Sequence, residues 1–183
     1  MTNIQLRSSA QLNLYSIIIR FIYLLRGARI SHSVIFFRRS LLERFISGIT
    51  INSDVILKSF CRICCCNQDS NIVIGSRSTV GFYTLIYSSK SISIGNDCMI
   101  GPSVFIADSN HDLLKFSTMN SQSNRVSPIT IMDDVWIGSH SVITAGVTIS
   151  TGAVISAGSV VISDIPPYAI VGGNPATILK FRV

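Results

Sequence analysis

The sequence of 183 residues has little charge and few strong helix formers. Charged residues make up 13% of the chain and hydrophobic residues 48%, while Ile and Ser are abundant. The shortage of helix formers predicts a β-rich protein. The shortage of charge fits a thin solenoid whose coils point aliphatic side chains inward and Ser, Thr and Asn outward. The length suits one domain, with or without an N-terminal appendage.

A secretory signal with a cleavage site is lacking, and so is a complete set of zinc ligands. The five cysteines are an odd number, and four of them lie within residues 61–66. Cys61 and Cys64 have metal-like spacing, but zinc usually takes four ligands and no second Cys/His pair is spaced to complete a site. We therefore expect no metal, buried core cysteines at Cys61 and Cys98, and a reduced cytoplasmic setting.

Acidic residues are scarce in the first third of the chain. Residues 1–62 hold nine Arg and Lys against Glu43 and Asp54, a net charge of +7, whereas residues 63–183 hold six against seven. The basic third suggests an anionic neighbour such as lipid head groups. Nucleic acid is not expected, because neither a recognition motif nor an interleaved aromatic patch accompanies the charge.

Residues 11–25 are strongly apolar and end at Arg26-Gly27, which is a helix stop signal. Arg20 interrupts the run, which is also shorter than the ~20 residues that a membrane span needs. Two interpretations stay open. The helix packs on the solenoid or on a neighbouring subunit, or residues 11–29 lie on the inner membrane face, where Arg7 and the later arginines would help.

Residues 131–161 repeat with a period of six. The first position of each six is aliphatic, and the fifth is small or Val. The first positions are Ile131, Ile137, Ile143, Ile149, Ile155 and Val161. A period of six is typical neither of a helix nor of a flat strand, but of a solenoid. Three sixes predict one triangular coil of ~18 residues with a short strand on each side.

An Ile-x-Ile opener marks the start of successive coils and ends at Ile51, Ile74, Ile94 and Ile131. The intervals exceed one coil by five, two and nineteen residues. The small excesses predict bulges at corners, and the large one predicts a loop of roughly residues 112–128 that leaves the solenoid. A long loop on a regular scaffold is usually functional or disordered.

Three parts follow from this pattern. Residues 1–29 form a helical N-terminal segment, residues 30–166 form the solenoid domain, and residues 167–183 form a C-terminal capping segment. Residues 177–181 are expected to be a short helix or a last strand that covers the open end.

Several strings carry a family resemblance. They are Trp136-Ile-Gly-Ser-His, Asp164-Ile-Pro-Pro-Tyr-Ala and Gly173-Asn-Pro-Ala. Together with the repeat they resemble the hexapeptide-repeat acyltransferases, in the branch of the maltose, galactoside, xenobiotic and polysaccharide O-acetyltransferases. The resemblance is strong over residues 72–183 and weaker over 30–71. It implies an all-β fold, a left-handed parallel β-helix, as well as a homotrimer, acetyl-CoA as donor and an active site between adjacent subunits.

Acetyl transfer to a hydroxyl needs a base, and histidine commonly serves as one near neutral pH. His111 ends the string Ala107-Asp-Ser-Asn-His, which resembles the family segment that ends in the catalytic histidine. Its orienting partner stays open among Asp108, Asp112 and a main-chain carbonyl. His140 is the rival base, although its string occurs in relatives where this histidine is not the base, and His32 is expected on the surface or in packing.

The resemblance also implies residues for the donor. Trp136 would form part of the wall of the acetyl-CoA and acceptor site. Ser139 and Ala157 would contact the pantetheine arm, and Ala145 and Gly146 would lie on the same groove. Lys180 would lie near the nucleotide phosphate. The structural alternatives are subunit packing for Trp136, plain corners for the small residues and a solvated Lys180. Ile162-Ser163 departs from relatives, which often have Thr-Lys near the diphosphate.

The acceptor is the least defined partner. The sugar-binding Asn and Asp of the maltose and galactoside enzymes should fall near Tyr83 and Ser88, and neither matches. Tyr83, Tyr87 or a residue beside the long loop such as Asn110 is expected to contact a different acceptor. We expect an O-acetyltransferase acting on a sugar hydroxyl, of a bacterial surface polysaccharide or its precursor. The alternatives are an antibiotic or other small-molecule O-acetyltransferase, an N-acetyltransferase on an amino sugar, and a non-catalytic scaffold.

Overall fold

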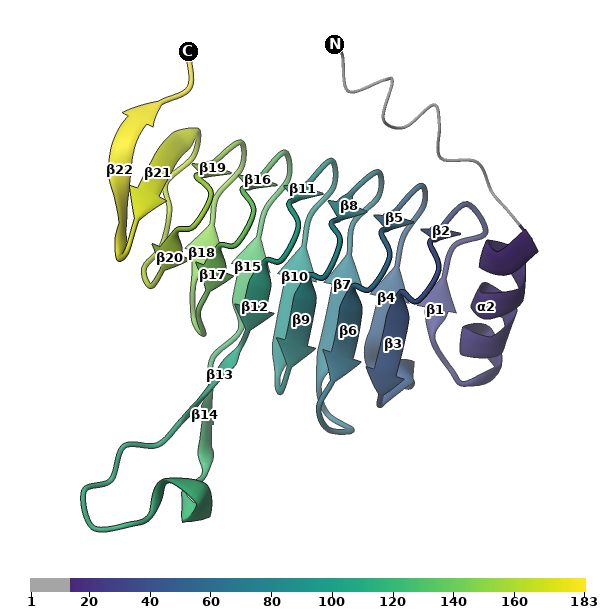
Figure 1. Cartoon of the computed structure of the whole chain (residues 1–183), viewed down its shortest axis with the longest axis horizontal. Coiled ribbons are helices and arrows are strands. Elements are labelled where there is room, and N and C mark those ends of the chain that lie inside the picture. The colour runs from purple at the N-terminus through teal and green to yellow at the C-terminus, as the bar shows by residue number, and fades with distance from the viewer. Residues whose placement is uncertain (1–13) are drawn as a thin grey trace.

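The structure, a computed structural model, describes residues 14–183 and consists of three parallel sheets that form the sides of a triangular solenoid (Figure 1). The first sheet contains β1 (Arg29–Ile30), β4 (Ile49–Ile51), β7 (Asn71–Ile74), β10 (Ser91–Ile94), β15 (Ile129–Ile131) and β18 (Thr148–Ile149). The second contains β2 (Ile35–Phe36), β5 (Ile56–Leu57), β8 (Thr79–Val80), β11 (Met99–Ile100), β16 (Trp136–Ile137), β19 (Val154–Ile155), β21 (Ala169–Gly173) and β22 (Ala176–Phe181). The third contains β3 (Leu41–Arg44), β6 (Arg62–Cys65), β9 (Leu85–Ser88), β12 (Phe105–Ala107), β17 (Val142–Ile143) and β20 (Val160–Val161).

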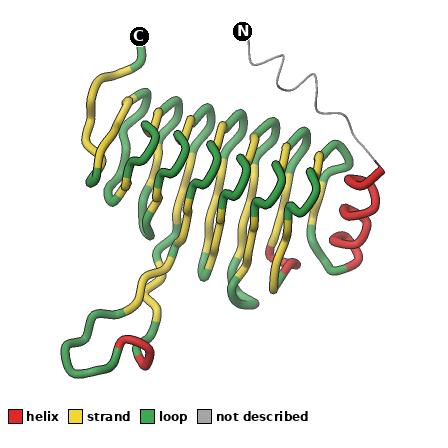
Figure 2. Tube along the Cα trace, in the orientation of Figure 1, coloured by secondary structure: helices red, strands yellow, loops and turns green. Residues whose placement is uncertain are grey.

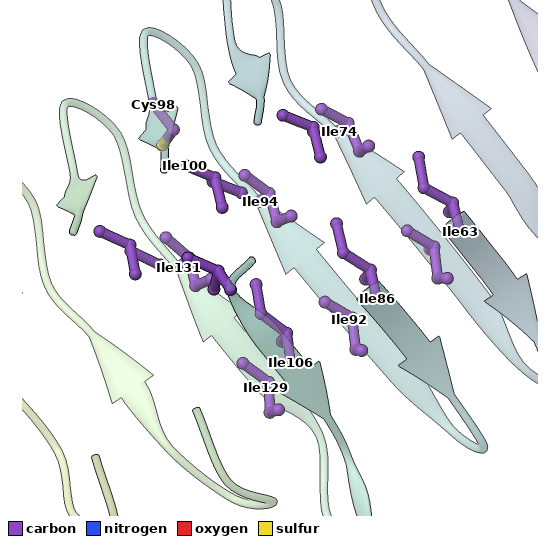
Figure 3. Close-up of a cluster of buried hydrophobic side chains, with 14 of the residues drawn as sticks. Ile63, Ile74, Ile86, Ile92, Ile94, Cys98, Ile100, Ile106, Ile129 and Ile131 are labelled. Atoms are coloured by element: carbon purple, nitrogen blue, oxygen red, sulfur yellow. The ribbon is translucent and has the colours of Figure 1, made fainter. Parts of the chain in front are cut away.

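The core is a set of aliphatic columns inside the solenoid (Figure 3). Ile94 pairs with Ile74 on one side and with Ile131 on the other, and Ile51 pairs with Ile74. These pairings confirm the coil starts predicted from the Ile-x-Ile openers. The paired residues are at most 1% exposed, because each coil stacks its aliphatic positions on those of the coil before it.

The extra residues between openers all emerge at one edge, between the third and the first sheet. Here the chain passes through the short 3₁₀ helix Ile46–Gly48, then residues 66–70, then Ser89 and Lys90. The next coil sends out residues 109–126 as an arm (Figure 2). We call this edge the arm edge, and the edge between the second and third sheets the Ser139 edge.

The arm begins as an antiparallel ribbon of β13 (Ser109–His111) and β14 (Asn124–Val126), and its tip carries a 3₁₀ helix, Met119–Ser121. The predicted excursion is therefore present, but its base is regular rather than looped. No hydrophobic alternation marks these strands, since their pairing depends on backbone hydrogen bonds away from the core.

The two ends of the solenoid differ. Helix α2 (Leu14–Leu25) packs on β1 and β2 at the N-terminal end, in agreement with the predicted helix, whose residues 11–13 lie outside the described chain. At the other end β22 folds back on β21 as an antiparallel strand, which is the second of the two expected forms of residues 177–181. Among the described residues no helix has the length and apolar character needed to cross a membrane.

The cysteines behave as small core residues. Cys61 and Cys98 are fully buried, as expected for their corner positions. Burial raises the pKa of Cys61 to about 12 and that of Cys98 to about 11, so both thiols are protonated at neutral pH. The same cause raises the pKa of Cys65 to about 11. Protonated and buried thiols of this kind are weak nucleophiles and weak metal ligands.

Because successive coils stack closely, a methyl group added between two coils should lower the stability of the protein strongly. A Cβ added at Gly75 would lie 2.4 Å from the Gly95 carbonyl carbon, whereas nothing lies within 4 Å of a Cβ at Gly158. Gly75→Ala should lower the free energy of unfolding by about 3 kcal/mol. Gly158→Asn should change it little, because Asn tolerates the left-handed backbone there. Equal melting temperatures for the two variants would contradict this packing.

Candidate active site

A cleft of about 350 Å³ lies where the arm leaves the solenoid, over the outer face of the third sheet. Its walls come from five successive coils and from both strands of the arm. They are Arg44, Cys66, Tyr87, Ser89, Phe105, Ala107, Ser109, Asn110, Asn124, Val142, Ile143 and Thr144. Tyr87 and Phe105 meet edge to face with ring centroids 6.2 Å apart. The cleft thus combines aromatic rings with hydroxyl, amide and guanidinium groups, a mixture that suits a polar organic ligand.

His111 is exposed on β13, directly after the cleft residues Ser109 and Asn110. It pairs directly with Asn124 across the ribbon, and Ser109 stands two residues before it. Opposite residues in an antiparallel pair, and residues two apart in a strand, share one face. His111 therefore shares its face with Asn124 and Ser109, both of which line the cleft.

Asp108 fixes the base of the arm. Its side chain is fully buried, and its carboxylate accepts hydrogen bonds from the Ser88 hydroxyl and from the backbone N–H groups of Ser89, Lys90 and Ser91, at 2.6–2.8 Å. These four donors lie in the turn of the preceding coil. Asp108 therefore locks the arm to that turn, and both of its oxygens are occupied.

Asp112 is also engaged, since the Arg125 Nε donates to its carboxylate across the ribbon. This ion pair joins the two strands just beyond His111. Both candidate carboxylates thus have other partners, which favours a main-chain carbonyl as the group that orients the His111 ring.

Ser139 and Ala157 lie one above the other at the Ser139 edge. Gly158 donates its N–H to the Ser139 carbonyl over 2.8 Å, and a Cβ at Gly138 would sit 2.5 Å from the Ala157 nitrogen. Within residues 14–183 the N–H groups of Ser139 and Ala157 donate to no protein acceptor. This edge therefore presents small side chains and free amides, which an amide-rich chain such as pantetheine could bond.

Trp136 and Lys180 lie on one row across the outer face of the second sheet. Trp136 pairs with Val154, Val154 with Ile170, and Ile170 with Lys180. Three strand spacings of ~4.8 Å separate them. Trp136 is 50% exposed, so its indole is not part of the core. The row runs beside the Ser139 edge, and the structure thus brings Trp136, Ser139, Ala157 and Lys180 to one side of the molecule.

Ala145 and Gly146 lie elsewhere, at the arm edge. Gly146 donates to the Ser127 carbonyl at the foot of the arm, 3.1 Å away, and has a φ of 87°. These two residues therefore share an edge with His111 and Asn110 rather than with Ser139. Residues six apart occupy successive corners of the triangle, and only residues one whole coil apart share an edge.

Tyr83 belongs to an aromatic ladder on the Ser139 edge, away from the cleft. Its ring stacks on Phe60 at 5.0 Å, and the Arg39 guanidinium lies 5.6 Å from the Phe60 centroid. Lys58 stands beside this ladder, 4.3 Å from the centre of the Phe37 ring, and burial lowers its pKa. Tyr83 and Asn110, both predicted to contact the acceptor, thus lie on different edges of the chain.

The two other histidines stand apart from the cleft. His140 occupies a left-handed corner with φ 60° on the Ser139 edge, and His32 offers its carbonyl to Arg20 near the N-terminal end. Over residues 14–183, no group of three His, Cys, Asp or Glu side chains is arranged to hold a metal ion.

The cleft contains residues that the repeat alone did not identify, among them Arg44, Phe105, Asn124 and Thr144. The pairing of successive coils could have identified the cleft residues of the third sheet. Phe105 pairs with Leu85 and Ala107 with Tyr87, so side chains about twenty residues apart meet on one face. The arm residues had no such signal, because antiparallel pairing outside the solenoid follows no period.

The structure is thus a parallel β-helix with a protruding arm that carries a histidine, and comparisons with known proteins identify its family. Residues 128–163 match the family described as "Hexapeptide repeat of succinyl-transferase". The chain is 31% identical over 146 residues to WbbJ of Escherichia coli (strain K12), which bears the name of a lipopolysaccharide biosynthesis O-acetyl transferase. That match covers 75% of this chain and 69% of WbbJ. This chain therefore belongs to the hexapeptide-repeat acetyltransferases.

Two further similar proteins agree with this family assignment. The galactoside O-acetyltransferase of Escherichia coli (strain K12) is 38% identical over 111 residues, 61% of this chain and 54% of that protein. The chain thus spans about half the length of that relative. A Vibrio cholerae hexapeptide-repeat acetyltransferase solved with acetyl-CoA is 27% identical, with a TM-score of 0.67 over 97% of this chain and 83% of that one.

The fold itself is the left-handed parallel β-helix. A mutant of the N-acyltransferase AntD of Bacillus cereus, solved with dTDP and coenzyme A, superposes with a TM-score of 0.79 over 90% of this chain and 89% of that one. At 20% identity this likeness concerns the fold alone. It confirms the fold class predicted from the repeat and the resemblance.

The bonds of Asp108 predict a specific loss of stability. Asp108→Ala removes the acceptor of four donors and should lower the free energy of unfolding by about 3 kcal/mol. Asp112→Ala breaks one ion pair whose arginine side chain is 78% exposed, and should cost less than about 1 kcal/mol. Urea unfolding of the two variants compares these costs, and a smaller loss for Asp108→Ala would show that its carboxylate does not hold the turn.

Proposed function

We propose that this chain transfers the acetyl group of acetyl-CoA directly to a hydroxyl group of a sugar. The observation that carries the proposal is His111, exposed on the face of β13 that continues into the acceptor cleft. Relatives named as O-acetyltransferases support a hydroxyl rather than an amine as the acceptor group. The name of WbbJ favours a surface polysaccharide or its precursor, and a cytoplasmic site of action agrees with the free thiols.

In the proposed reaction the neutral imidazole of His111 takes the proton of the acceptor hydroxyl as its oxygen attacks the thioester carbonyl carbon. A tetrahedral intermediate forms, and backbone N–H groups can stabilise its oxyanion. The carbon–sulfur bond then breaks, the acetyl ester remains on the sugar, and the CoA thiolate takes the proton back from the imidazolium. No covalent acyl-enzyme is needed.

The acceptor is proposed to occupy the cleft. Tyr87 and Phe105 give it aromatic walls, while Arg44, Asn110 and Asn124 offer hydrogen bonds. Tyr83 lies on the other edge and would meet the acceptor only from a neighbouring chain.

The donor is proposed to bind between two chains of a homotrimer. Within one chain, His111 lies at the arm edge, whereas Trp136, Ser139, Ala157 and Lys180 lie around the Ser139 edge. If the arm edge of one subunit faces the Ser139 edge of the next, base and donor meet. Ala145 and Gly146, beside the foot of the arm, would then form the near wall of the same groove.

His111→Asn removes the proposed base while keeping a side chain of similar polarity. It should lower kcat by ~10²–10⁴-fold without lowering acetyl-CoA affinity. The matched control is His140→Asn, which suits the left-handed backbone at position 140 and should retain most activity. Release of the CoA thiol with an oligosaccharide acceptor measures both rates. Activity that survives His111→Asn and disappears in His140→Asn would assign the base to His140.

A further inference from the structure

Helix α2 presents an apolar surface away from the protein. Every exposed residue of this twelve-residue helix is a large apolar one, with 41–73% of its surface accessible. They are Leu14, Ile17, Ile18, Phe21, Ile22, Leu24 and Leu25. A continuous apolar surface of this kind on a soluble protein usually marks a contact with a partner or a membrane.

The polar groups of α2 point the other way, into the protein. The Ser16 hydroxyl donates to the Phe36 carbonyl and accepts from the Phe36 N–H, both at 2.9 Å. The Tyr23 hydroxyl accepts from the Leu42 N–H, and the Tyr15 hydroxyl accepts from the Arg39 N–H.

These bonds satisfy backbone groups of the first coil, on which α2 packs in place of another coil in the described part of the chain. Burial accordingly raises the pKa of Tyr23. Arg20 also turns back, to the carbonyl of His32. The polar side chains of α2 thus bond to the end of the solenoid, and its outward surface is made of apolar side chains.

The charges around α2 indicate which partner its apolar surface would bind. Residues 1–42 contain six arginines and no Asp or Glu. Arg26 and Arg29 are exposed at the end of α2, and Arg38 and Arg39 are exposed on the first coil. A second copy of the chain would bring these cations against their own kind, which is unfavourable, whereas an anionic surface attracts all of them.

We propose that α2 docks this protein on an anionic lipid surface. A twelve-residue helix is ~18 Å long, too short for a bilayer core of ~30 Å. It therefore lies along the surface, with its seven outward residues among the acyl chains and the arginines among the head groups. Membrane docking extends the proposed acetyl transfer but does not depend on it, because no residue of α2 lines the cleft and α2 lies far from the arm that carries His111 (Figure 1).

Co-sedimentation with phosphatidylcholine vesicles, with and without 30% phosphatidylglycerol (roughly the share that gives a clear surface potential), tests this assignment directly. The wild-type chain should bind the anionic vesicles, bind the neutral ones more weakly, and be partly released by high salt. Ile18→Gln combined with Phe21→Gln should weaken binding at least about tenfold. Arg26→Gln combined with Arg29→Gln should weaken binding to the anionic vesicles alone.

The matched control is Leu113→Gln combined with Phe116→Gln. Both side chains are more exposed than any on α2, but they lie on the arm. This variant should bind vesicles as the wild type does. Unchanged melting temperatures and unchanged mass by light scattering show that the variants remain folded and assembled. Equal vesicle binding by the α2 variant and the arm variant would overturn the proposal. So would a wild-type chain that binds no vesicles together with a smaller assembly of the α2 variant, and that result would make α2 a subunit contact.

Discussion

The backbone hydrogen bonds between successive coils hold each coil in fixed parallel register with its neighbours, and the other features of the molecule depend on that register. Because Ile51, Ile74, Ile94 and Ile131 pair in sequence, their side chains stack into one buried column. The same register leaves no room for a Cβ where coils touch. It also lets Asp108 reach the turn of the preceding coil and hold the base of the arm.

Because three edges run the length of the solenoid, variation at one edge leaves the others intact. Insertions in successive coils all occur at the arm edge, and they culminate in the arm that carries His111. The Ser139 edge stays regular, with small residues where the free amides lie. The proposed division of labour follows from this difference: the regular edge holds the donor, and the irregular edge supplies the base and contacts the acceptor.

Much of the fold could be predicted from sequence, since a period of six fixes both which residues are buried and where one coil ends. The openers gave the strand register, and the nineteen extra residues located the arm. The antiparallel ribbon of the arm escaped prediction, because backbone pairing outside the core leaves no hydrophobic pattern. The apolar run at residues 11–25 predicted a helix, but it did not reveal that Ser16 and Tyr23 would face inward.

The sequence did not show which of the predicted site residues share an edge of the solenoid. Ser139 and Ala145 are six residues apart and were expected on one groove, but six residues advance the chain by one side of the triangle. They therefore lie on different edges, and one chain does not unite His111 with Trp136. A site shared by the two edges of adjacent subunits, as proposed, would bring them together.

Subunit complementation tests that assignment most directly. His111→Asn and Trp136→Ala chains, each expected to be nearly inactive alone, would be co-expressed with different tags and the mixed trimers purified. A site shared between subunits predicts that activity returns, because every mixed trimer places an intact His111 opposite an intact Trp136 at one of its three interfaces. Mixed trimers as inactive as either parent would contradict the shared site.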